Sequence, residues 1–185
     1  MSTIENRKNY FPNVKDGEIF EIGGMEFIKF PSVNGKTPVV MKGIACNSRF
    51  GDNNDLRGSD VRQKMETEIL PKIIEVVGEE NLCTIGTDLT TLDGLNPYGT
   101  MESLISLPTL DFYRANVSIF DKYNPNCWWW LATPESAQPH SKPNWILCVS
   151  PSGRIRYYHY YYDVCGVRPF LIFNSSIFGS PEAEQ

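Results

Sequence analysis

The chain has 185 residues, of which 41% are hydrophobic, 12% aromatic and 21% charged, a composition typical of one globular domain. Its net charge of −5 argues against a surface built to coat nucleic acid or an anionic membrane. No apolar run approaches the ~20 residues of a membrane-spanning helix, and the N-terminus lacks the apolar core of a signal peptide. We therefore expect no membrane insertion and no export signal.

The first 80 residues predict a small antiparallel meander followed by one helix. Gly23-Gly24 separates the apolar runs 18–22 and 25–30, which is a two-residue hairpin signal, and 37–45 has the character of a third strand. Apolar residues then recur at helical spacing at Val61, Met65, Ile69, Ile73 and Val76.

Three residues set the limits of that helix. Ser59 or Asp60 is expected to cap its start, and Gly78 is expected to end it. Pro71 lies inside the pattern and has no amide hydrogen, so it should kink the helix or divide it in two.

The remainder predicts one short helix and a strand-rich C-terminal part. We expect a short strand at 83–85 and a helix at 106–113, and Trp128-Trp-Trp-Leu131 is followed by a proline-rich loop at 133–143. Pro151-Ser-Gly153 is a turn between two further strands, 145–149 and 154–164, and the apolar run 170–173 closes the fold. Strands, helices and strands in separate blocks indicate the α+β class.

We expect a single domain at 15–174, between a flexible N-terminal arm at 1–14 and a C-terminal tail at 175–185.

Three segments carry a resemblance to a known family: Trp128-Trp-Trp-Leu-Ala-Thr-Pro134, Ser150-Pro-Ser-Gly153 and Gly166-Val-Arg-Pro-Phe-Leu-Ile172. They resemble a bacterial and phage domain of unknown function marked by Trp-Trp-Leu-Arg-Ser-Pro and Gly-Val-Arg-Pro-Ala-Leu. That family is similar to the C-type-lectin-like domains of formylglycine-generating enzymes and retroelement-diversified proteins. The resemblance implies a C-type-lectin-like fold with a small antiparallel sheet, two helices and a loop-rich C-terminal half. Ala132 stands where the family has arginine, so no role of that arginine transfers to this chain.

No motif in the sequence indicates catalysis, a cofactor or a metal. The five cysteines, which form no C-x-x-C pair and are expected to be reduced and mostly buried, are Cys46, Cys83, Cys127, Cys148 and Cys165. The two histidines, His140 and His159, have no nucleophile or orienting partner near them in sequence. Asp52-Asn-Asn-Asp55 lacks the spacing of a calcium loop. We expect a protein that is not an enzyme; the enzymatic alternative would use Cys127, Cys148 or Cys165.

Five of the nine tyrosines lie between Tyr157 and Tyr162. On a strand, alternate residues face opposite sides, which would place Tyr157, His159 and Tyr161 on one face and the other three tyrosines on the opposite face. Exposed tyrosine beside arginine is typical of binding surfaces. The alternative is a strand packed beneath the loop 133–144. The residues predicted to bind ligand are Arg156, Tyr158, Tyr160, Tyr162, His159 and Trp128.

The residues predicted to be structural are Trp129, Trp130, Gly166, Arg168 and Pro169. Arg168 is expected to be a buried arginine that ties loops together, with Asp60 or Asp55 as its partner.

These expectations converge on a ligand-recognition module. The leading hypothesis is a phage or prophage virion-associated protein that binds a protein or glycan through the tyrosine-rich C-terminal surface. Such a protein would be found in the virion or the bacterial cytoplasm, and it could associate with other virion proteins or with copies of itself. The alternative is an intracellular phage-encoded inhibitor or regulator of a host defence protein. Nucleic acid is disfavoured as a partner by the acidic charge.

Overall fold

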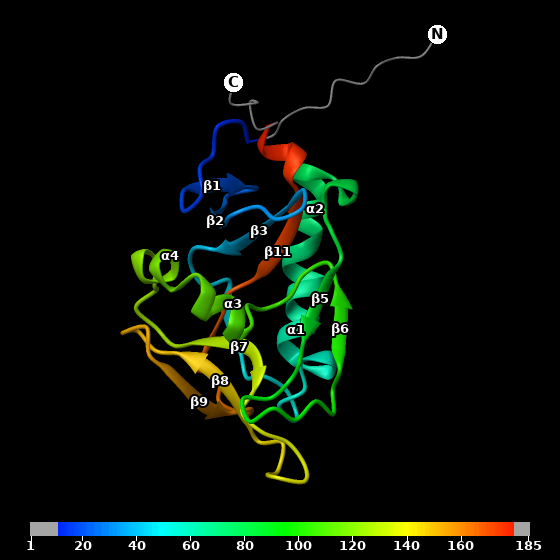
Figure 1. Cartoon of the computed structure of the whole chain (residues 1–185), viewed down its shortest axis with the longest axis vertical. Helices are drawn as coiled ribbons and strands as arrows, with labels where there is room; N and C mark the ends of the chain where they lie inside the picture. The colour runs from blue at the N-terminus through cyan, green and yellow to red at the C-terminus, as the bar shows by residue number, and fades with distance from the viewer. Residues whose placement is uncertain (1–10, 180–185) are drawn as a thin grey trace.

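The computed structural model describes residues 11–179. The chain is mixed α+β, with about 24% helix and 30% strand, so the expected class is confirmed. Figure 1 shows one sheet at the end of the molecule where the described chain begins and finishes, and a second sheet at the opposite end. A long helix runs along one side between them.

The first sheet combines the expected N-terminal meander with the closing strand of the chain. Gly23 and Gly24, with φ of 56° and 81°, make the tight turn of its first hairpin. Its strands, in spatial order, are β1 (Ile19–Ile22), β2 (Met25–Lys29), β3 (Lys36–Met41) and β11 (Phe170–Asn174).

The second sheet brings the family-like motifs together. Gly166 in β10 pairs with Trp129 in β7, and this is the one parallel pairing among the strands of residues 11–179. The strand β9 lies at the edge, hydrogen-bonded to β8 alone. The strands, in spatial order, are β4 (Cys46–Asn47), β10 (Gly166–Val167), β7 (Trp129–Pro134), β8 (Trp145–Val149) and β9 (Ile155–His159).

The long helix starts and stops where the sequence predicts. The Ser59 hydroxyl accepts the Arg62 amide hydrogen at 3.0 Å, and Gly78 ends the helix with φ of 78°. Pro71 divides it as expected, since a π-helical turn precedes it and accommodates its missing amide hydrogen. The three segments are α1 (Asp60–Lys64), the π-turn (Met65–Ile69) and α2 (Leu70–Val77).

The central third holds elements that the sequence predicted only in part. The expected helix at 106–113 begins later, because Thr109 caps it by accepting the Phe112 amide hydrogen. These elements are β5 (Ile85–Asp88), β6 (Thr100–Ser103), α3 (Leu110–Ala115) and α4 (Val117–Lys122), with 3-10 turns at Leu56–Gly58 and Glu79–Asn81. The sequence analysis missed β6 and α4. No helix within residues 11–179 is long and apolar enough to cross a membrane.

The central strands of the second sheet, β7 and β8, are buried on both faces. Trp130, Ile146 and Cys148 pack into one hydrophobic cluster, which also contains the buried side of the long helix. Trp129 and Leu147 pack into a second cluster with α3 and α4. Every residue of β7 is buried, so this strand is the centre of the fold.

Residues on both sides of the expected domain limits pack on the core. The Phe11 amide donates to the Ile177 carbonyl at 3.0 Å, and the Phe11 ring lies 4.8 Å from that of Phe20. Ile177 and Phe178, in a 3-10 turn (Ser175–Phe178), are buried against the same cluster. The globule therefore extends past the expected limits at 15 and 174; residues 1–10 and 180–185 of the expected arm and tail lie outside the described residues.

Candidate ligand-binding surface

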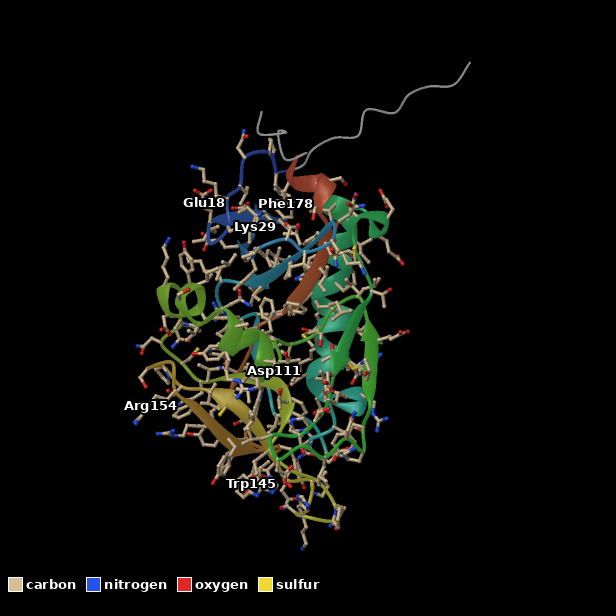
Figure 2. All side chains as sticks on the ribbon, viewed as in Figure 1. Glu18, Lys29, Asp111, Trp145, Arg154 and Phe178 are labelled. Carbon is tan, nitrogen blue, oxygen red and sulfur yellow. The ribbon has the colours of Figure 1, made fainter. Side chains whose placement is uncertain are left out.

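The hairpin formed by β8 and β9 gathers aromatic rings at the end of the molecule away from Glu18 and Phe178, and Figure 2 labels Arg154 and Trp145 near the hairpin's two ends. The Trp145 ring lies 5.6 Å from that of Tyr157 and 5.2 Å from that of His159. On the other face of β9, the rings of Trp128 and Tyr158 meet edge to face at 4.9 Å. We call residues 154–164 the aromatic edge.

The aromatic edge exposes a large share of the molecule's apolar surface. Tyr157 and Tyr161 are each 54% exposed and Tyr162 is 41% exposed, and Val164 is exposed beside them. Half of the large exposed hydrophobic residues among 11–179 therefore fall in these eight positions, 157–164. Contiguous exposed apolar residues of this kind mark interaction sites, whereas isolated ones are ordinary.

The expected alternation of faces holds only as far as His159, where the strand ends. Tyr160 and Tyr161 form a turn, which the Tyr162 amide closes by donating to the His159 carbonyl at 3.1 Å. Tyr161 and Tyr162 are therefore both exposed, and the expected division into two rows beyond residue 159 was wrong. The strand ends here because the Tyr160 carbonyl accepts the amide hydrogen of Phe50 at 2.7 Å, a contact distant in sequence.

The residues predicted to bind ligand differ in exposure. Arg156 and Tyr162 are exposed, whereas Tyr158 and Tyr160 are half-buried and pack against the core. Trp128 is half-buried beneath Tyr158. Tyr157 and Tyr161, which were not in the predicted set, are the most exposed of the tyrosines at this edge.

His159 is enclosed by rings. Its centroid lies 4.2 Å from that of Tyr160 and 4.0 Å from that of Tyr161, with Trp145 on a third side. Its Nδ1 atom is shielded and has no hydrogen-bond partner within residues 11–179. The histidine thus holds the rings of the turn in place by packing.

Arg154 and Arg156 differ from the other arginines of the described chain. Both are exposed, and neither forms an ion pair with any carboxylate among residues 11–179. The arginines that are paired with carboxylates are Arg49, Arg57, Arg62 and Arg114. Two unpaired cations on one edge strand of an acidic protein make this edge locally basic.

Arg168 is fully buried at the centre of the fold. Its Nε donates to the Met41 carbonyl at 2.8 Å, and Nη2 donates to the carbonyls of Lys42 (3.0 Å) and Tyr123 (3.1 Å). The guanidinium carbon lies 4.8 Å from the Trp129 ring centroid. Burial lowers its pKa to about 10.

The expected carboxylate partners of Arg168 were wrong. Asp60 instead pairs with Arg49 and Asp55 pairs with Arg57, whereas the hydrogen bonds of Arg168 go to backbone carbonyls. Backbone carbonyls carry no sequence signal, which is why the sequence could not indicate these partners.

The other residues predicted to be structural are also buried in the core. Trp129 and Trp130 are fully buried, and their indole nitrogens donate to Asn124 Oδ1 (2.9 Å) and the Ser48 carbonyl (2.8 Å). Gly166 allows a close approach, since a Cβ there would lie 2.5 Å from Ile44 Cδ1. The carbonyl of Pro169 accepts the Met41 amide hydrogen at 2.9 Å.

Two polar contacts that the sequence analysis missed hold the loop 135–144, one buried at Asn54 and one at the surface at Asp93. The fully buried Asn54 donates from Nδ2 to the carbonyls of Ser136 (2.8 Å) and Trp145 (2.9 Å). Asp93 accepts from Ser136 Oγ at 2.7 Å and lies 2.9 Å from His140 Nδ1. Hydrogen bonds from Thr91, Ser136 and His140 keep the pKa of Asp93 well below its usual range.

This cluster does not have the connectivity of a catalytic triad. Ser136 and His140 both bond to Asp93, whereas a triad needs a serine–histidine bond. The residues are 43 and 47 positions from Asp93, a separation at which sequence spacing gives no signal.

All five cysteines are free thiols, but Cys46, Cys83 and Cys127 are only half-buried, so the expectation that most of them would be buried was wrong. Cys148 and Cys165 are buried next to each other, and their mutual hydrogen bond together with burial raises the pKa of Cys165. Burial also raises the pKa of Cys127 and that of Cys46. Raised thiol pKa values oppose thiolate formation at neutral pH, which is the reverse of what a nucleophilic cysteine needs.

A cleft lies away from the aromatic edge. It measures about 380 Å³ and opens between β2, the loop 43–46 and the long helix, where Met25, Ile44 and Ile69 line it beside Glu26 and Glu68. Within residues 11–179, no three His, Cys, Asp or Glu side chains are grouped so that they could hold a metal ion.

No protein-family model, curated protein or solved structure matches the chain.

Proposed function

We propose that the chain is a non-enzymatic recognition module that binds a protein or glycan ligand through its aromatic edge. One observation carries the proposal: exposed Tyr157, Tyr161 and Tyr162 adjoin two unpaired arginines on the edge of a sheet whose central strand is wholly buried. Tyrosine offers a large rigid area and a hydroxyl at small cost in conformational entropy, and arginine adds charge and directional donors.

The surface is held in place before any ligand binds. Tyr158 packs on Trp128, and the half-buried ring of His159 lies against those of Tyr160 and Tyr161. The loop 135–144 that follows β7 is fixed by Asn54 and Asp93. A surface ordered in this way loses less entropy on binding than a flexible one.

The C-type-lectin-like fold is the finer part of the proposal. It is supported by the way in which the family-like motifs meet: the Gly166 amide donates to the Trp128 carbonyl at 2.7 Å, and Arg168 lies over the Trp129 ring. The placement in a phage virion rests on that resemblance alone.

The test is a parallel screen of immobilised protein against a glycan array and a random-peptide display library. The wild type is compared with Tyr161→Ser/Tyr162→Ser and with Val33→Ser, a control because Val33 is 63% exposed in the turn between β2 and β3. We expect ligands that bind the wild type and the control but not the tyrosine variant, with all three proteins folded by circular dichroism. Ligands that bind all three proteins equally would contradict the proposal.

A further inference from the structure

The open edge of β9 presents backbone groups in a defined pattern. The Tyr160 amide donates to the Asn144 carbonyl at 3.0 Å, and the Ser150 amide donates to the Arg154 carbonyl at 2.9 Å. Because hydrogen-bonded pairs alternate along an antiparallel ladder, the even-numbered residues of β9 direct their backbone groups toward β8. The residues that direct theirs toward the open edge are Ile155, Tyr157 and His159.

Most of these outward groups are unused. The Ile155 carbonyl accepts from Arg156 Nη1 at 3.0 Å, and the His159 carbonyl accepts the Tyr162 amide hydrogen. Within the described part of the chain, the outward amides and the Tyr157 carbonyl have no hydrogen-bond partner. A row of this kind is a template on which another strand can pair.

The side chains at this edge select the strand that would pair with it. Arg154 and Arg156 lie on the same face as Tyr158, and both arginines lack a carboxylate partner among residues 11–179. Ile155 and Tyr157 lie on the opposite face, where Tyr157 is exposed. Asp163 is the single acidic residue of the aromatic edge.

We propose that the ligand is an extended acidic peptide segment that pairs antiparallel with β9 as a sixth strand of the second sheet. Acidic side chains at alternate positions of the peptide face Arg154 and Arg156, and the apolar side chains between them face Ile155 and Tyr157. The inference rests on the proposed function and narrows its ligand class to protein.

The other edges of the two large sheets do not share these properties. The edge strand β1 has Glu18 before it and Glu21 within it, which would repel an acidic strand, and it carries no large exposed hydrophobic residue. The edge strand β4 has only two residues, so it offers little main chain for pairing. The edge strand β11 is already covered, because the carbonyls of Phe170 and Ile172 accept the amide hydrogens of Ser106 (2.9 Å) and Cys83 (2.8 Å).

The probe is a capped peptide of alternating glutamate and valine, titrated into the isotope-labelled full chain and followed by amide NMR and hydrogen exchange. We expect saturable binding with slowed exchange at the Ile155, Tyr157 and His159 amides. Two N-methylated peptides of identical charge form the matched control. In the first, the valine amides are methylated, which removes the donors that face β9 and should weaken binding at least about tenfold. In the second, the glutamate amides are methylated; these amides face away from β9, so binding should be preserved.

Two protein variants separate the tyrosine ring from the backbone. Tyr157→Ala removes the ring, and Tyr157→Pro also removes the outward amide, which proline can do at an edge without breaking the ladder to β8. We expect Tyr157→Pro to bind clearly more weakly than Tyr157→Ala, and Arg154→Gln/Arg156→Gln to bind about threefold to tenfold more weakly than wild type. Each variant is checked for a wild-type amide spectrum outside residues 153–162.

No binding of the unmethylated peptide, or equal binding of both methylated peptides, would overturn strand pairing. Suppose that the ligands recovered by the screen depend on Tyr161 and Tyr162 and yet are glycans, or are peptides that bind Tyr157→Pro as well as they bind Tyr157→Ala. In either case the recognition surface stands and this inference fails. If no screened ligand depends on Tyr161 and Tyr162, the proposed function fails with it.

Discussion

The centre and the edge of the second sheet have opposite physical characters. In the centre, β7 is buried along its whole length, and the Arg168 guanidinium donates three hydrogen bonds to backbone carbonyls. At the edge, the rings of Tyr157 and Tyr161 are more than half exposed, and two arginines have no carboxylate partner in residues 11–179. Figure 1 shows β7, β8 and β9 in this order at one end of the molecule. One sheet thus contains both a stabilising centre and an edge whose side chains are available to a ligand.

The largest loss of stability is expected when the centre loses Arg168. Arg168→Ala removes the donor to three backbone carbonyls, one of them fully buried, and leaves a cavity against Trp129, so the free energy of unfolding should fall by about 3 kcal/mol or more. Urea denaturation followed by tryptophan fluorescence measures this change. A midpoint equal to that of wild type would mean that the centre does not depend on this arginine.

A smaller loss is expected where β10 approaches the loop before β4. In Gly166→Ala, the new Cβ would meet three atoms of the Ile44 side chain at 2.5–2.9 Å, which should cost about 1–3 kcal/mol of unfolding free energy. Ile44→Ala removes the obstructing atoms, so the double variant should lose less stability than the sum of the two single variants. Strictly additive losses in denaturation would rule out this contact as the cause.

The loop beside the aromatic edge should respond to acid. Hydrogen bonds from Thr91, Ser136 and His140 hold the pKa of Asp93 below its ordinary value. In the unfolded chain Asp93 takes up a proton near pH 4, whereas in the folded chain it stays ionised to lower pH. The ionised side chain therefore stabilises the fold above pH 4, and this stabilisation is lost as the pH falls toward the lowered pKa. The stability difference between wild type and Asp93→Asn should shrink between pH 6 and pH 3; a constant difference in urea melts would contradict this coupling.

The smallest effect on stability is expected at the edge itself. Tyr161 and Tyr162 lie in an exposed turn, so Tyr161→Ser/Tyr162→Ser should change the unfolding free energy by only about 0.5 kcal/mol. Thermal denaturation of this variant, with Val33→Ser as the control, measures the change in stability. A loss comparable to that of Arg168→Ala would show that these rings belong to the core.

The sequence predicted local features well and long-range ones poorly. The strands 145–149 and 170–173, the Ser59 cap and the Gly78 stop were confirmed, because each depends on neighbouring residues or on a clear apolar pattern. The strand expected to run to residue 164 ends at His159, where the Tyr160 carbonyl bonds to the Phe50 amide and the Tyr162 amide closes a turn on the His159 carbonyl. Five tyrosines within the six positions 157–162 also give no contrast between buried and exposed positions.

The same limit applies to the candidate site. The tyrosine-rich segment was located from composition, and the burial of Arg168 was foreseen. The partners of Arg168 and the Asp93–Ser136–His140 cluster depend on residues more than 40 positions apart. Which tyrosines are exposed depends on the turn at Tyr160 and Tyr161, which only the folded chain shows.

The most direct test of the division between centre and edge is amide hydrogen exchange of the full chain with and without a ligand recovered by the screen. We predict that bound ligand slows exchange within residues 155–162 and leaves β7 and β10, which are already protected, unchanged. Protection that appears instead around the cleft lined by Glu26 and Ile69, with none at residues 155–162, would contradict the account.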